Sequence, residues 1–159
     1  MKRIFVLLIL MLALFSCAER YELLSYQEGD ISAKCSLNDK YIINVEKSAD
    51  ERVLKILEPC ELEGVEFRCT SEGCVAICDD IEIPIDRALL NGVVAICSIF
   101  DLDESAIQAS IADEDEASVS FLMDDISYTV TYGDDCLPSL IEISTDGFSH
   151  ILRVLEITK

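Results

Sequence analysis

The sequence predicts an antiparallel α+β domain, a half-barrel or a sandwich, in which one helical segment interrupts a long series of strands. Apolar and polar residues alternate along about ten short segments, the period of strands with one buried face. Turn-forming residues separate these segments at short intervals, as antiparallel connections require. Near the middle of the chain the apolar spacing changes to that of a helix. Strands on both sides of a single helix favour the α+β class.

Residues 1–16 are predicted to be a lipoprotein signal peptide. Lys2 and Arg3 precede an unbroken apolar run, residues 4–15, which is too short to cross a ~30 Å hydrocarbon core as a helix. The end of this run and Cys17 resemble a bacterial lipobox, in which Cys17 is acylated and becomes the new N-terminus. Ordinary secretion, with a cut after Ala18, is the alternative.

The mature chain is predicted to be a single domain, residues 17–159. Removing 16 of the 159 residues leaves 143, enough for one sizeable core. The removed segment contains two basic residues and no acid, so the formal charge moves from −19 to −21. This charge excludes nucleic-acid binding through phosphates and opposes contact with anionic membranes. Attachment to the membrane is therefore expected through lipid on Cys17, and the acidic residues are interpreted as a solvated surface.

Six strands are expected before the helix. Asn38-Asp39 is expected to turn the first strand into the second, and the polar run 48–51 breaks the second from the third. The expected strands cover residues 30–37, 41–46, 53–57, 65–70, 74–78 and 81–85.

The hairpin at residues 65–78 has two alternative registers. Gly73 suits the left-handed position of a three-residue loop. That loop places Cys69 opposite Val75 and Phe67 opposite Ile77, apolar against apolar. A two-residue loop would place charged residues opposite Val75 and Ile77, so we predict the three-residue loop.

One amphipathic helix is predicted from about residue 86 to residue 100, because apolar residues recur there at helical spacing. Asn91-Gly92 is a turn signal, which leaves two short helices or a hairpin as alternatives. Asp103 is expected to cap a second short helix that ends near Gln108. Further strands are expected near Ile111 and at residues 119–123, 126–132, 140–144 and 148–157.

Seven cysteines remain besides Cys17, and an odd number leaves at least one outside any intramolecular disulfide. Cys74 and Cys78 share a predicted strand and would lie ~13 Å apart, beyond the ~7 Å limit for a bridge. Cys69 could pair with Cys74 only in the two-residue register. Most of these cysteines are interpreted as small apolar core residues. Because paired C-x2-C knuckles are absent, no zinc site is predicted.

No catalytic residue and no cofactor are predicted. His150, the one histidine, alternates with Phe148 and Leu152 and is interpreted as a strand residue facing water or a lid. Motifs for a serine nucleophile, a zinc protease or a phosphate loop are missing. The acidic clusters 101–104 and 113–116 lack the spacing of a calcium loop and are interpreted as turns. We expect a protein that is not an enzyme and holds no metal.

Several segments resemble the LolA-like lipoprotein-carrier family. These are Glu-Pro at 58–59, Leu-Glu-Gly-Val at 62–65 with the hairpin that follows, Tyr-Thr-Val-Thr-Tyr at 128–132, and the Leu-Pro strand at 137–143. The resemblance covers most of the mature chain, and the small lipid-anchored members of Gram-positive bacteria are the most similar. It implies an incomplete barrel whose concave apolar face is covered by a helical lid and holds acyl chains. The lipobox differs from the soluble carriers and is closer to their membrane-anchored acceptor.

A ligand-binding face is predicted from this resemblance together with the strand pattern. A single sheet of about ten strands tends to curl, and one helical segment cannot cover its apolar face evenly. The predicted ligand-binding residues are Phe67, Val75, Ile77, Phe121, Tyr128 and Val130, with ordinary core packing as the alternative.

We therefore expect an envelope lipoprotein that binds an acyl chain or a lipidated partner. The alternative is an anchored interaction module with a filled core, which meets a protein through an edge strand or its acidic face.

Overall fold

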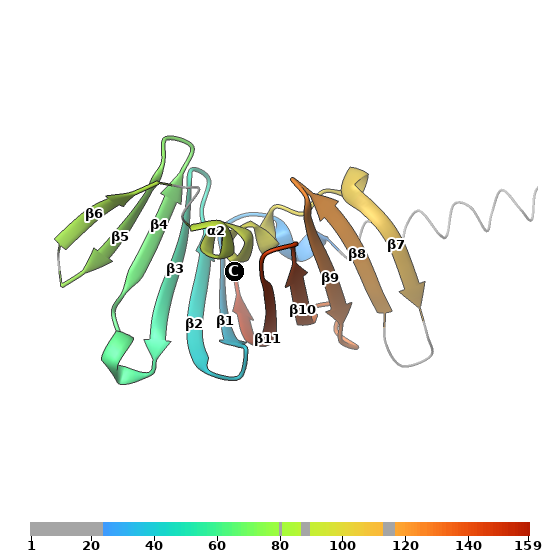
Figure 1. Ribbon diagram of the computed structural model, residues 1–159. Helices are drawn as coiled ribbons and strands as arrows, with labels where there is room; N and C mark the ends of the chain where they lie inside the picture. The colour runs from blue at the N-terminus through green and yellow to red at the C-terminus, as the bar shows by residue number, and fades with distance from the viewer. Residues whose placement is uncertain (1–23, 80, 87–89, 113–116) are drawn as a thin grey trace, which may run out of the picture.

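The computed structural model describes residues 24–79, 81–86, 90–112 and 117–159, so the predicted signal peptide and Cys17 lie outside it. The described residues form a curved, unclosed antiparallel sheet of eleven strands with one short α-helix (Figure 1). The strands are β1 (Ile31–Leu37), β2 (Tyr41–Lys47), β3 (Glu51–Glu58), β4 (Glu66–Thr70), β5 (Cys74–Cys78), β6 (Ile81–Ile85), β7 (Ile107–Ala112), β8 (Ala117–Met123), β9 (Ile126–Tyr132), β10 (Pro138–Ser144) and β11 (Ser149–Thr158).

The strand order is β6-β5-β4-β3-β2-β1-β11-β10-β9-β8-β7. Two meanders, β1 to β6 and β7 to β11, meet where β1 pairs with β11 in the middle of the sheet (Figure 1). The strands β6 and β7 therefore form the two edges. The strand order and the position of the helix in the chain confirm the expected antiparallel sheet with a helical insert near the middle of the chain.

Two tight turns use backbone conformations that their residues tolerate. Asn38 and Asp39 follow β1 with φ of 52° and 54°, as the sequence predicted for a turn at this place. Asp124 and Asp125 connect β8 to β9 with φ of 50° and 64°, the pattern of a two-residue type I′ turn. Asn and Asp occupy the left-handed region more readily than most residues because their short side chains can bond to nearby backbone.

The predicted register of the β4–β5 hairpin is wrong. Cys69 pairs with Cys74 and Phe67 with Ala76, while Val75 and Ile77 lie opposite charged residues. The Thr70 N–H donates to the Gly73 carbonyl at 2.9 Å, which closes a loop of two residues instead of three. The apolar pairing that favoured the other register is outweighed here by a Cys69–Cys74 disulfide, with Cα atoms 4.2 Å apart.

The helix is shorter than predicted. It covers α2 (Asn91–Cys97) and continues as the 3₁₀ turn η4 (Ser98–Phe100), and residues 87–89 lie outside the described part. The Asn91-Gly92 pair begins the helix rather than breaking it. The other 3₁₀ turns are η1 (Ser25–Gln27), η2 (Cys60–Leu62) and η5 (Glu104–Ala106), and the Asp103 carboxylate accepts from the Ser105 N–H as the predicted cap.

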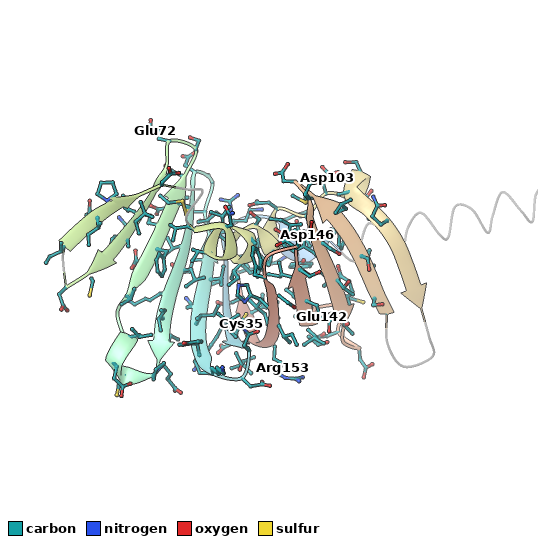
Figure 2. All side chains as sticks on the ribbon, in the orientation of Figure 1. Cys35, Glu72, Asp103, Glu142, Asp146 and Arg153 are labelled. Atoms are coloured by element: carbon teal, nitrogen blue, oxygen red, sulfur yellow. A yellow bond between two sulfur atoms is a disulfide. The ribbon has the colours of Figure 1, made fainter. Side chains whose placement is uncertain are left out.

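One apolar core joins this helical segment to the inner face of the sheet. Ile96, Ile99 and Phe100 are buried together with residues from both meanders. Tyr26 of η1 packs edge-on against Phe100 and Tyr132, with ring centroids 6.3 Å apart in each pair. The charged side chains labelled in Figure 2 are exposed to solvent, as the acidic composition suggests. They are Glu72, Asp103, Glu142, Asp146 and Arg153.

An ion cluster fastens the end of the helical segment to β2 and β3. Arg52 donates from Nε and Nη2 to the two carboxylate oxygens of Asp101, at 2.9 and 2.6 Å. Lys47 Nζ lies 3.4 Å from Asp101 and donates to the Phe100 carbonyl at 2.8 Å. Burial alone would raise the pKa of Asp101, but its hydrogen bonds and charge contacts with Arg52 and Lys47 lower it overall.

Asp101→Asn is expected to destabilise the fold by roughly 1–2 kcal/mol, because the amide loses the charged pairing while a third of the side chain stays exposed. Asp39→Asn is the matched control, since the Asp39–Arg153 pair is mostly exposed, and little change is expected. The measurement is urea unfolding at several pH values. Because the folded-state pKa of Asp101 is lowered, its contribution is present above about pH 4 and disappears as the pH falls through the folded value. Equal losses for both variants would contradict the assignment.

Candidate ligand pockets beside helix α2

Among the hollows that border helix α2 in the described residues, two could hold a ligand. The first, which we call the apolar pocket, has a volume of about 400 Å³ and lies between α2 and strands β1 to β4. The second, which we call the acidic cleft, is larger, about 1610 Å³, and lies between α2 and the turns that end β8 and β10. A volume of about 400 Å³ is within the ~300–1,000 Å³ of small-molecule sites.

The walls of the apolar pocket are almost entirely hydrocarbon. Strand alternation and register place apolar residues from several strands on this face, because directly opposed residues of an antiparallel pair share a face, as Leu54 does with Phe67. The helix contributes a second wall. The apolar side chains that line the pocket are Leu37, Ile43, Leu54, Ile56 and Phe67 from the strands, Leu62 from η2, and Leu90, Val93 and Ile96 from the helical segment.

Two polar side chains, Tyr41 and His150, complete the described lining of the apolar pocket. The His150 ring stacks on Phe148 with centroids 5.1 Å apart, and its Nδ1 lies 3.3 Å from Asn38 Nδ2. Burial lowers the pKa of His150 because its charged form loses hydration. The imidazole is therefore neutral near pH 7.

Gly92, in the first turn of helix α2, lies against the ring of His150. An ideal Cβ placed on Gly92 would lie 2.9 Å from His150 Nε2, a contact that real Cβ atoms do not make. A side chain at this position would therefore displace the imidazole from the first turn of α2. Glycine lets the ring and the helix backbone lie against one another.

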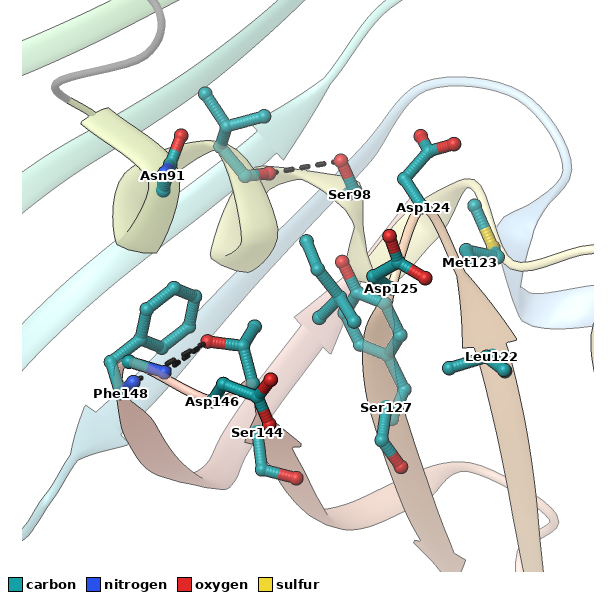
Figure 3. Close-up of a pocket in the computed structure, with 15 residues that line it drawn as sticks. Asn91, Ser98, Leu122, Met123, Asp124, Asp125, Ser127, Ser144, Asp146 and Phe148 are labelled. Atoms are coloured by element: carbon teal, nitrogen blue, oxygen red, sulfur yellow. Dashed lines mark hydrogen bonds between the residues drawn. The ribbon is translucent and has the colours of Figure 1, made fainter.

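The acidic cleft has a different character. Asn91 and Ser98 face it from the helix, while Asp124, Asp125 and Asp146 stand on the hairpin turns opposite (Figure 3). Its lining includes these three carboxylates and no basic residue among those described. The cleft is thus open and polar at its rim, whereas the apolar pocket is suited to hydrocarbon.

The structure separates the six residues predicted to bind a ligand. Phe67 lines the apolar pocket, and Tyr128 borders the acidic cleft although its side chain is only 1% exposed. Phe121 and Val130 pack in the closed core, the alternative stated for them. The two remaining residues, Val75 and Ile77, lie on the opposite face of the sheet from Phe67, because the hairpin has the other register.

Sequence reasoning missed the helical wall of the pocket and its polar end. Leu90 and Val93 are apolar residues within the predicted helix, and their spacing of three residues could have assigned them to one wall. The alternation of His150 with the buried Leu152 places His150 on the inner face, which was the available signal.

The prediction that most cysteines are core residues is wrong, because the free cysteines Cys60, Cys78 and Cys136 are exposed and Cys69 is bonded to Cys74. The two buried free cysteines offer little chemistry. Cys35 and Cys97 are buried, and loss of hydration raises the pKa of each thiol to about 12. Such thiols are poor nucleophiles because the thiolate is the reactive form. Within the described ranges, His, Cys, Asp and Glu do not gather in any group of three or more that could hold a metal ion. In the same residues, no helix has the length and apolar character needed to cross a membrane.

Comparison with known proteins identifies the fold alone. No family model and no curated protein matches the chain. The solved structure of an uncharacterized conserved protein from Thermus thermophilus is similar, with 12% identity, a TM-score of 0.51, and coverage of 91% of this chain and 87% of that one. A LolA superfamily protein from Nitrosomonas europaea matches at 11% identity and a TM-score of 0.42, over 81% and 83% of the two chains. The first likeness gives the chain a fold shared with a solved bacterial protein.

Proposed function

We propose that this chain is a non-enzymatic envelope lipoprotein that binds an acyl chain, free or carried by a lipidated partner, in the apolar pocket. The observation that carries the proposal is the pocket itself, about 400 Å³ of space between α2 and β1 to β4 with hydrocarbon on nearly every side. Each ligand methylene that leaves water for such a site contributes ~0.8 kcal/mol. No catalytic group or cofactor is needed for this activity.

The helical segment, residues 91–100, acts in this proposal as the cover of the concave face of a LolA-like half-barrel. Its support is the shared core, in which Ile96 and Phe100 pack against the sheet, and the salt bridges of Asp101 that hold its far end. Val93, nearer the start of the segment, packs against the same core.

Acylation of Cys17 is the proposed means of attachment to the membrane, as in the small lipid-anchored members of Gram-positive type. The first strand, β1, begins at Ile31, 14 residues after Cys17, a length of chain that spans at most about 50 Å. The pocket would then operate within a few nanometres of the membrane, the source of acyl chains.

Native mass spectrometry of the mature chain, purified from its own host's envelope fraction, tests the proposal. The expected result is excess mass over the denatured chain, which extracts as lipid. The control is the same chain after delipidation in organic solvent and refolding, which should show the bare mass. Repeated preparations without excess mass, and without uptake of added fatty acid, would reject the proposal.

An interaction module is the second candidate function, and one observation favours it. Ile81 and Ile83 of the edge strand β6 are 63% and 53% exposed, on the same face of the sheet as Phe67. Exposed apolar side chains on an edge strand are typical of a surface that another protein covers. A bare mass in the experiment above, together with a co-purifying protein, would support this function.

A further inference from the structure

The hydrogen bonds around His150 assign its neutral tautomer. Asn38 Oδ1 accepts from the Ile151 N–H at 2.8 Å, which fixes the orientation of the amide. The Asn38 Nδ2 group, which can only donate, then faces His150 Nδ1 at 3.3 Å. Nδ1 is therefore the acceptor, and the proton of the neutral ring resides on Nε2.

The Nε2 atom lies beside Gly92, and both residues line the apolar pocket. In the described part of the chain, the one hydrogen bond of the ring joins Nδ1 to Asn38, so Nε2–H is available to a water molecule or a ligand. A ligand that supplies an acceptor at this position would take the place of water as the partner of the donor. The rest of the pocket offers the Tyr41 hydroxyl and otherwise only hydrocarbon.

We propose that His150 is the polar anchor of the apolar pocket, and that its Nε2–H donates a hydrogen bond to the carbonyl or carboxylate oxygen at the head of an acyl chain. The inference rests on the proposed function and narrows it, because it makes the ligand an acyl compound rather than any hydrocarbon. A fatty acid and an acyl ester share this oxygen. The fatty acid carries a negative charge and the ester does not, and the pKa of the His150 ring responds to that difference.

The charges around His150 leave it free to respond to a bound carboxylate. Helix α2 contributes no charged side chain between residues 91 and 97. On the β1–β2 turn, the Asp39 carboxylate accepts from Arg153 Nε of β11 at 3.2 Å, so these two charges offset one another. Tyr41 is the other titratable group of the described lining. A carboxylate bound at Nε2 would therefore be the nearest negative charge and would raise the pKa of His150.

Nuclear magnetic resonance of the imidazole tests the proposal directly, since the chain has one histidine and hence one ring titration. The chain beginning at Ala18 is titrated against pH in the presence of dodecanoic acid, methyl dodecanoate or dodecyltrimethylammonium. We expect the acid to raise the pKa of the ring and to shift the Nε2 resonance. The ester should shift Nε2 without raising the pKa, and the ammonium compound, which lacks an oxygen, should do neither.

His150→Phe is the matched variant, because it keeps an aromatic ring against Phe148 and removes the donor. Its affinity for the acid and the ester should fall roughly three- to tenfold, with affinity for dodecyltrimethylammonium unchanged. Equal affinities of the native chain and the variant for all three compounds, with an unresponsive ring, would overturn the anchor while leaving the pocket as a hydrocarbon site. Failure of all three compounds to bind would overturn the proposed function and the anchor together. The ring titration uses the native chain, so the test does not depend on the variant folding.

Discussion

Val93→Trp is expected to lower the affinity for dodecanoic acid at least tenfold, which corresponds to about 1.4 kcal/mol. Val93 lies on the wall that α2 contributes to the apolar pocket. An indole at this position occupies the space that the acyl chain would fill. Because the pocket is open rather than closely packed, the added volume should cost less stability than the ~1–3 kcal/mol typical of an overfilled core.

Val94→Trp is the matched control for this prediction. Val94 is the next residue of the same helix and is also partly buried, but it lines the acidic cleft instead of the apolar pocket. Isothermal titration calorimetry with dodecanoic acid should therefore distinguish the two variants, and circular dichroism should show similar melting temperatures. If Val93→Trp binds as the native chain does, or if both variants lose binding equally, the apolar pocket is not the site.

Tyr128→Ala should destabilise the domain by about 3–5 kcal/mol, the range for removing a buried aromatic side chain. Tyr128 is 1% exposed, and its hydroxyl donates to the Ala95 carbonyl at 3.3 Å, which ties β9 to the helix. The sequence had suggested this residue as a ligand contact, but its burial gives it a structural role. Such a loss is large compared with the ~5–15 kcal/mol stability of an ordinary domain.

Tyr128→Phe separates the ring from the hydroxyl. It retains the packing and removes one hydrogen bond, so a loss of about 1 kcal/mol is expected. Guanidinium unfolding of both variants measures the difference. If the alanine variant unfolds at the same denaturant concentration as the phenylalanine variant, the ring is not part of the core.

The sheet was largely predictable because its signal is local. Alternation located the strands, and turn residues such as Asn38 located their ends. One antiparallel meander follows another, so chain order nearly gives spatial order. The pairing of β1 with β11 joins residues at opposite ends of the chain, and no local pattern could specify it.

The candidate site was predicted less well, for two physical reasons. A single change of register at the β4–β5 hairpin moved Val75 and Ile77 to the other face, since side chains alternate with a period of two. The disulfide that accompanies this register could not be assigned from spacing alone. In addition, pocket walls and core walls have the same composition, so only the position of α2 distinguishes Phe67 from Phe121.

The central seam between β1 and β11 affects how the protein is made. Ser32 and Thr158 meet across it, 126 residues apart, whereas every other pair of neighbouring strands in the described sheet is consecutive along the chain. During synthesis, β1 therefore has one side unpaired until the final strand emerges. An unpaired strand edge invites association between chains, so the interval before β11 docks is when the new chain is most exposed to aggregation.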